Sequence, residues 1–360
     1  MFGSNFNIIS STITATFLCS LYSEVSFAQA NTEGHWRFEQ SMGEIVDSYP
    51  RKGTVDQTNG RQNNGFVGSW DGAWSENENP LSRNGIRVKF TGETEDHIIM
   101  IDDEVHQDFN ADIYTFVWKA RLKINWRDLE PGNKLAPNAT WNVMQKGRSN
   151  KGGMWKMQIM PFAPKSNRFF NEAQQEEIAN SDWELQAKAG DPVIMCQVQD
   201  ENNTTFEAMS RVRLVPGTVY YPRCVINRSD NKLKAQIRFN KSKKDIKPET
   251  KFVAVNKSPL TRIVDGKEVQ LGVVNPGMFG RFTCVAGRPG GFEGHDLLNM
   301  VSIGHKPVCP GFSSKRQAII DHPDSSQEEI DAAKADLEDL FQDAFKGKIY
   351  QVKIEKPTTF

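Results

Sequence analysis

Hydrophobic and polar residues alternate in short runs along most of the chain, with Gly, Pro, Asn and Asp between the runs. The clearest run is residues 115–124 (TFVWKARLKI), where Phe116 and Trp118 alternate with Lys119 and Arg121. A period of two residues predicts a strand with one face in a core and one polar, basic face. Further runs of this style lie at residues 35–39, 86–90, 97–101, 141–146, 154–160, 183–188, 193–198, 219–226, 233–239, 252–255, 300–303 and 349–354. So many short strands with almost no helix predict an all-β sandwich or barrel.

Two segments interrupt this alternation. Residues 161–181 are polar with an acidic middle, and we expect a loop with one helical turn there. Residues 325–345 predict a helix, because Ser326 and Glu329 have the spacing of a capping box. The apolar stripe of this helix consists of Ile330, Ala333, Leu337, Leu340 and Phe341. We expect the helix to be an insertion that lies over the sandwich.

The charge balance limits the classes of partner. The chain has 44 Lys and Arg against 45 Asp and Glu, which gives a formal net charge of −1. Such a protein has no overall field that would attract nucleic acid or an anionic membrane, although basic strand faces can still form local patches. Aromatic residues make up 10% of the chain, which is too apolar a composition for a disordered protein.

The first 30 residues have the pattern of a signal peptide. An apolar stretch at residues 8–21 precedes Ala28-Gln29-Ala30, an A-x-A cleavage pattern. A disordered tail or a membrane anchor is the alternative, but the stretch is too short and too polar to span a bilayer as a helix. We therefore expect a single domain at residues 31–360, secreted to the extracellular space or the periplasm, with no membrane insertion after cleavage.

The five cysteines agree with export. Cleavage removes Cys19 and leaves an even four, which suits an oxidising compartment. A lipoprotein anchor on Cys19 is the alternative role for that residue. No C-x-x-C pair occurs, so we do not expect the cysteines to bind a metal.

Four motifs in order along the chain resemble the bacterial laminin-G-like branch of the concanavalin A-like lectin and glucanase family. They lie at residues 35–39 (HWRFE), 141–159 (WNVMQKG, then GMWKMQI), 196–224 (two Cys around Gly217) and 302–349 (SIGHK, then FKGKI). The third motif departs from the family, which has Trp and His where this chain has Val219, Tyr220 and Tyr221. The last has Tyr350-Gln351 in place of an acidic pair. The resemblance covers residues 35–355 discontinuously and implies a jelly-roll β-sandwich, whose first and last strands pair.

The resemblance also implies a disulfide. Family members often carry a Cys pair at the positions of Cys196 and Cys224, and two strands joined by a hairpin would make these residues cross-strand neighbours. Cys284 and Cys309 would then pair with each other.

Jelly-roll sandwiches of this family often bind a ligand on the concave sheet. Basic, amide and aromatic side chains on the predicted strand faces suit an acidic polysaccharide, because Arg and Lys bind carboxylates and sulfates. The candidate ligand-binding residues are Lys119, Arg121, Lys146, Trp155, Lys156, Gln158, Arg211 and Arg213. An ordinary solvated sheet face is the alternative, since alternation alone explains exposed charges.

Calcium is a candidate cofactor, because carboxylates gather in the loop that follows residue 101 and hard cations prefer oxygen ligands. The candidate ligands are Asp102, Asp103 and Asp108 in this loop, and Asp71 earlier in the chain. The pattern is not an EF-hand, because Ile113 and Lys119 occupy the required Gly and Glu positions. An acidic, solvated turn is the alternative.

Catalysis has weaker support in the sequence. The E-x-D-x-E triplet that glucanases of this fold place on one strand face is absent. A strand of alginate-lyase relatives reads Q-I-H, whereas here Gln158-Ile159 is followed by Met160. A lyase would need a base and a charge neutraliser, and the candidates are Tyr220, Tyr221, Arg223 and His305.

These observations favour a secreted glycan-binding or adhesion protein without chemistry of its own. The first alternative is a lyase acting on an anionic polysaccharide, which we prefer to a glycoside hydrolase. The second is a structural surface protein that binds another protein.

Overall fold

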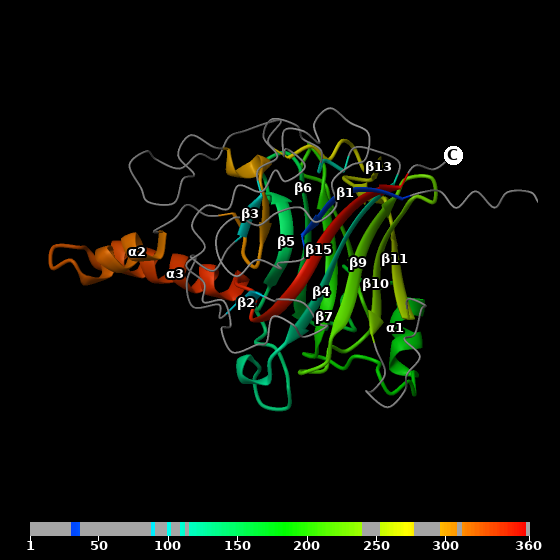
Figure 1. Cartoon of the computed structure of the whole chain (residues 1–360), viewed down its shortest axis with the longest axis horizontal. Helices are drawn as coiled ribbons and strands as arrows, with labels where there is room; N and C mark the ends of the chain where they lie inside the picture. Colours follow the sequence, from blue (N-terminus) through cyan, green and yellow to red (C-terminus); the bar gives the residue numbers. More distant parts are fainter. Residues whose placement is uncertain are drawn as a thin grey trace, which may run out of the picture.

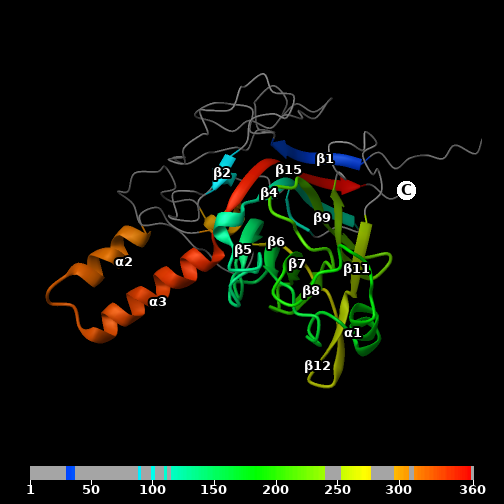
Figure 2. The ribbon, with the colours of Figure 1, turned by 90° about the horizontal axis from the view of Figure 1, so that it is seen from below.

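The structure is a computed structural model that describes residues 30–36, 88–90, 99–101, 109–111, 115–239, 253–276, 296–307 and 312–357. These ranges contain two large antiparallel sheets stacked as the two layers of a sandwich (Figures 1 and 2). This confirms the predicted all-β jelly-roll class.

The first sheet has seven strands within the described ranges. In spatial order they are β1 (Ala30–Trp36), β15 (Gly347–Pro357), β4 (Thr115–Ile124), β9 (Tyr220–Asn227), β10 (Lys232–Phe239) and β11 (Val253–Pro259), with β2 (Val88–Phe90) beside β15. The first and last strands pair antiparallel, as predicted, with Ala30 opposite Pro357.

The second sheet has six described strands. In spatial order they are β3 (Ile99–Ile101), β14 (Val301–Ile303), β5 (Trp141–Gly147), β6 (Met154–Pro161), β7 (Pro192–Gln199) and β8 (Thr205–Met209). A separate hairpin consists of β12 (Thr261–Val264) and β13 (Lys267–Gln270). Residues 183–188, which the alternation predicts as a strand, form only an isolated bridge between Gln186 and Val212. Strands β8, β12 and β13 were not predicted.

The core lies between the sheets and follows the predicted alternation of β4. Phe116, Trp118, Ala120 and Leu122 are buried, and the Trp118 ring lies 5.5 Å from the ring of Trp155 on β6 in the other sheet. Aromatic contacts of this geometry add to the hydrophobic stabilisation. The side chains between them on β4 point away from the core.

The Cys196–Cys224 disulfide is present, with the two Cα atoms 5.6 Å apart. Cys196 lies on β7 and Cys224 on β9, so the bond joins the two sheets through the core and not two strands of a hairpin. The predicted pair is therefore correct and its predicted placement is wrong. Cys19, Cys284 and Cys309 lie outside the described residues, as does nearly all of the predicted signal peptide.

Three α-helices lie in the described part of the chain: α1 (Glu172–Ala179), α2 (Phe312–Asp321) and α3 (Gln327–Asp343). The predicted single turn near residue 175 is a helix of eight residues with a capping box at Asn171. None of the described helices has the length and apolar character that crossing a bilayer requires.

Helix α3 confirms the predicted capping box, with Ser326 at the N-cap and Glu329 at the third position. It does not lie over the sandwich as predicted. Helices α2 and α3 pack against each other and project to one side, and only the end of α3 reaches the sheet, where Ala344 bridges Asn142 (Figures 1 and 2).

Replacing Ser326 with Ala is expected to destabilise the first turn of α3 by about 1 kcal/mol, because the cap satisfies an otherwise unpaired backbone N–H. Faster amide hydrogen exchange in that turn, with unchanged exchange in β4, is the measurement. Unchanged exchange at the start of α3 would contradict the capping role.

Candidate functional site

A row of polar side chains crosses the six-stranded sheet on the face that points away from the core. Strand register places Gln145 of β5 opposite both Ser302 of β14 and Lys156 of β6. Lys156 in turn lies opposite Gln197 of β7, which lies opposite Glu207 of β8. We call these five residues the polar row. Because neighbouring strands are about 4.8 Å apart, the row extends over roughly 19 Å.

Amide hydrogen bonds hold Gln145, which lies next to Lys156 in the polar row, and Gln158 near it on the same face. Asn142 donates to the side-chain oxygen of Gln145, whose Nε2 donates to the backbone carbonyl of Gly147 at 2.8 Å. Gln158 lies opposite Asn142 on the same face and donates to the carbonyl of Thr140 at 3.2 Å. These contacts fix the amides in place before any ligand arrives.

An arginine holds the β8 end of the polar row. Arg168, from the segment between β6 and α1, forms two hydrogen bonds with the carboxylate of Glu207, which also accepts from Nε2 of Gln197 at 2.7 Å. The contact with Glu207 raises the pKa of Arg168. Beside this end, Phe169, Phe170 and Ile178 pack on the outer side chains of β7 and β8 in a second apolar cluster.

The other end of the polar row, at β14, lies near the C-terminal end of α3, the helix that pairs with α2 in a helical hairpin. Lys306, just after β14, forms ion pairs with Asp339 at 2.6 Å and with Asp343 at 2.7 Å. Asp343 also accepts a hydrogen bond from the Thr140 hydroxyl. The hairpin thus brings carboxylates of α3 to this face.

Lys156 is the unusual member of the polar row. Burial lowers its pKa from 10.5 to about 8, although the charges of Asp343 and Glu207 act in the opposite direction. Within the part of the chain that the structure describes, its ammonium group has no hydrogen-bond or ion-pair partner. Desolvation of a cation without such compensation is unfavourable.

Two acceptors close to Lys156 in the register also lack donors. Gln197 Oε1 and Asn142 Oδ1 are buried and accept no hydrogen bond from any residue in the described ranges. Buried polar groups in native proteins are nearly always paired, so each unpaired one calls for an explanation. An anionic group of a ligand would supply the partner that the Lys156 ammonium lacks.

The structure separates the predicted ligand-binding residues. Lys156 and Gln158 lie on the face of the polar row, whereas Lys119 and Arg121 lie on the outer face of the other sheet. There Lys119 pairs with Glu355 at 2.7 Å, and Arg121 lies over the rings of two tyrosines. These tyrosines are Tyr221 and Tyr350, at 5.6 and 4.8 Å from the guanidinium carbon.

Two other predicted ligand residues point into the sandwich. Lys146 is fully buried and donates from Nζ to Asn110 Oδ1 at 2.6 Å, and Trp155 donates from Nε1 to the Phe109 carbonyl at 2.8 Å. They therefore lie inside the fold and not on the predicted ligand face. Arg211 and Arg213 follow β8, where Arg211 pairs with Glu177 at 2.8 Å and lowers the pKa of that carboxyl.

The four candidate catalytic residues do not gather at one place. Tyr220 is buried in the core, where its hydroxyl accepts from the Val215 N–H at 2.7 Å and burial raises its pKa. Tyr221 and Arg223 lie on the outer face of the seven-stranded sheet, with Arg223 bonded to Gln236. His305 is buried, with Nδ1 2.8 Å from the Lys306 carbonyl.

The calcium candidates Asp71, Asp102, Asp103 and Asp108 lie outside the described residues. Within the described ranges, no group of three or more His, Cys, Asp or Glu side chains could hold a metal ion. The calcium prediction stays a prediction.

Sequence reasoning missed several residues around Lys156, namely Gln197, Glu207, Arg168, Ser302 and Asp343. The alternation of β7 contained a signal for Gln197, because Cys196 and Val198 on either side of it are apolar. No local pattern indicated Arg168 or Asp343, which reach the sheet from outside it.

Comparison with known proteins gives no family. No family model matches the chain, and no curated protein matches its sequence. Among solved structures, a native heptameric SAP-like pentraxin from Limulus polyphemus matches with a TM-score of 0.28 and 8% identity, over 67% of this chain and 64% of the pentraxin chain. The binding domain of botulinum neurotoxin serotype G matches with a TM-score of 0.34 and 13% identity, over 76% of this chain and 46% of that chain. The likeness concerns the fold alone.

Proposed function

We propose that the chain is a glycan-binding protein that holds an anionic polysaccharide along the polar row. The observation that carries the proposal is Lys156, a desolvated ammonium without a described ion-pair partner in the middle of a polar sheet face. A carboxylate or sulfate of the ligand would supply the missing partner, since charge-assisted hydrogen bonds are the strong ones.

Lys156 is the cation that we assign to the ligand, because the structure describes no hydrogen-bond or ion-pair partner for its ammonium group. The neighbouring cations are already engaged, because Arg168 binds Glu207 and Lys306 binds Asp339 and Asp343. The anionic group of the ligand is therefore expected at Lys156, with a hydroxyl of the neighbouring sugar close to Gln197. An extended row of amide and hydroxyl groups suits a polymer better than a small ion.

The resemblance to laminin-G-like proteins agrees with this location, because its WNVMQKG and GMWKMQI motifs contain Gln145, Lys156 and Gln158. The proposal has no catalytic step. Tyr221 and Arg223 lie on the opposite sheet from Lys156, and Tyr220 lies in the core. The disulfide is typical of oxidising compartments, so we place this binding outside the cytoplasm.

The test is titration calorimetry of the protein with alginate, polygalacturonate and heparin, and with neutral dextran and laminarin. We expect binding to at least one anionic polymer and a loss of at least tenfold in affinity for Lys156→Gln, because a hydrogen bond to a charged group contributes about 1.5–3 kcal/mol. The matched control is Lys119→Gln on the opposite sheet face, which should bind as the wild type does.

Three results would contradict the proposal. One is the absence of binding to every anionic polymer, and another is full affinity in Lys156→Gln. The third is an equal loss in Lys119→Gln, which would place the ligand on the seven-stranded sheet or indicate binding by overall charge.

A further inference from the structure

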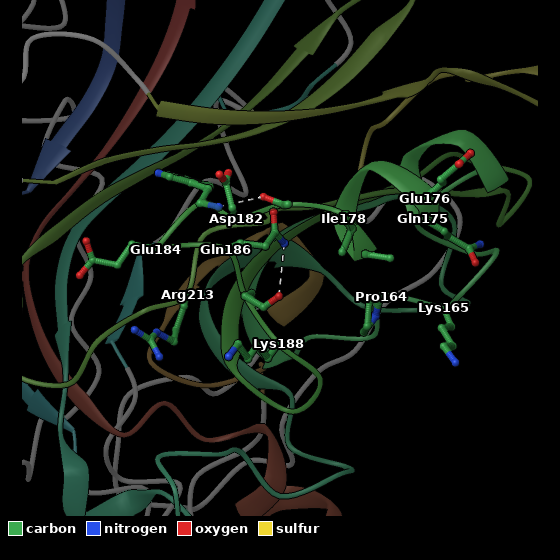
Figure 3. Close-up of a pocket in the computed structure, with 14 residues that line it drawn as sticks. Pro164, Lys165, Gln175, Glu176, Ile178, Asp182, Glu184, Gln186, Lys188 and Arg213 are labelled. Carbon is green, nitrogen blue, oxygen red and sulfur yellow. Dashed lines mark hydrogen bonds between the residues drawn. The ribbon is translucent and has the colours of Figure 1, made fainter.

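A pocket of about 840 Å³ lies at the far end of the six-stranded sheet, between α1 and residues 181–188 (Figure 3). Along β7 and β8 it is separated from the polar row by the apolar cluster around Met195 and Met209. Its volume is within the range of about 300–1,000 Å³ that is usual for small-ligand sites. None of the polar row residues lines it.

Backbone hydrogen bonds build the pocket floor. The segment around Gln186 pairs with the chain that follows β8, through Ala187 N–H to the Arg211 carbonyl at 2.9 Å and Arg213 N–H to the Leu185 carbonyl at 3.0 Å. The ion pair between Arg211 and Glu177 ties α1 to the same chain. The walls are thus connected to each other and to the sheet.

The pocket contains polar atoms that are buried and unsatisfied. Gln186 is 7% exposed, and its amide nitrogen donates to the Ala187 carbonyl at 3.2 Å (Figure 3). Its Oε1 accepts no hydrogen bond from the described chain, and Nε of Arg213 likewise has no acceptor there. A ligand with one acceptor and one donor would complete both groups.

Charged side chains of both signs surround the opening. They are Lys165, Lys188 and Arg213, and Glu176, Asp182 and Glu184. Within the described chain, none of these six forms an ion pair with any other residue. Three positive and three negative groups sum to zero, so the pocket has no preference for a charged ligand. Apolar contacts come from Ile178, Ala179 and Pro164.

We propose that this pocket binds an uncharged carbohydrate of one or two sugar rings, separately from the polymer at the polar row. Sugar hydroxyls both donate and accept hydrogen bonds. They can donate to the carboxylates and to the Gln186 oxygen, and accept from the ammonium groups. The C–H face of a ring matches the apolar wall. A polymer end or a side branch would present such a unit.

The experiment is saturation-transfer NMR of the full chain with methyl glucoside, methyl galactoside, N-acetylglucosamine, cellobiose and maltose, and with glycine betaine as a zwitterionic probe. We expect transfer from at least one sugar, and a loss of at least fivefold in affinity for Gln186→Leu and for Arg213→Met. Lys267→Met, in the exposed β12–β13 hairpin, is the matched control and should bind as the wild type does. If Gln186→Leu does not fold, Glu184→Gln and Lys188→Met test the same pocket from exposed positions.

The proposal is overturned if no sugar gives transfer, if only glycine betaine does, or if the pocket variants keep full affinity. Lys156→Gln separates this site from the polar row. We expect it to keep the binding of the small neutral sugar, and loss of that binding would assign the sugar to the polar row and overturn the pocket site.

Discussion

Replacing both Cys196 and Cys224 with Ala is expected to lower the free energy of unfolding by about 4 kcal/mol or more. The disulfide closes a loop with a sequence separation of 28 residues. In the chain-entropy model, removing such a crosslink destabilises by about 3–4 kcal/mol. Both sulfurs lie in the core, where neither residue is exposed, so the double variant also loses packing.

The position of the bond strengthens this expectation. It is a covalent connection between β7 and β9 across the core, so it restrains the separation of the two sheets themselves. Urea unfolding curves of the wild type and the double variant measure the effect. Reduced wild type is the control, because it loses the crosslink and retains the sulfur volume. The double variant under the same reducing conditions shows how much of the loss comes from any other disulfide. A loss below about 1 kcal/mol in both would show that packing alone holds the sheets together.

The strand pattern predicted the core of this fold because burial and alternation are local properties. Residues 115–124 were predicted as a strand, β4 spans the same residues, and its two faces have the predicted character. Ser326 and Glu329 likewise act over three residues, so the start of α3 was predictable. The length of α1 was not, because its segment is polar and is held by contacts with β7 and β8.

The alternation of residues does not predict which strands pair with each other or which sheet each strand joins. Alternation shows that β4 and β6 each have a polar face, but it does not show that these faces lie on opposite sides of the sandwich. This is why Lys119 and Lys156 were grouped as one ligand face. In the same way, the Cys196–Cys224 pair was predicted from the resemblance. That the two cysteines lie in different sheets follows only from the strand order.

A local irregularity explains the misplaced Lys146. The register of β5 against β6 shifts between Asn142 and Met144, and Val143 and Met144 are both buried in the core. A β-bulge of this kind reverses which residues point outward. Beyond it, Gln145 points outward with Asn142, and Lys146 points inward. A strict period of two places Asn142 and Lys146 on the same face.

Lys156→Met is expected to raise the free energy of unfolding at pH 7 by about 3–4 kcal/mol. Burial lowers the pKa of Lys156 from 10.5 to about 8, so the folded state disfavours the charged form. Each unit by which folding lowers the pKa corresponds to about 1.4 kcal/mol of the free energy of unfolding. Methionine has a similar length and no charge to desolvate, so the penalty disappears with the ammonium.

The pH dependence of this gain has a definite sign. Below about pH 8 both the folded and the unfolded chain are protonated at Lys156, and the full penalty is present. Between about pH 8 and 10.5 the unfolded chain holds a proton that the folded chain has released, so the stability of the wild type rises with pH. The advantage of Lys156→Met should therefore shrink over this interval and vanish above it.

Urea midpoints of Lys156→Met and wild type at pH 7 and pH 10.5 measure this difference, with Lys267→Met as the control that should show no gain at either pH. A structural lysine would give the opposite result, because removing a cation that is paired inside the fold leaves its partner uncompensated and destabilises the protein. Equal or lower stability of Lys156→Met at pH 7 would therefore contradict our reading of Lys156. Higher stability together with lost affinity for the anionic polymer is the combination expected when a protein retains an unfavourable buried charge for a ligand.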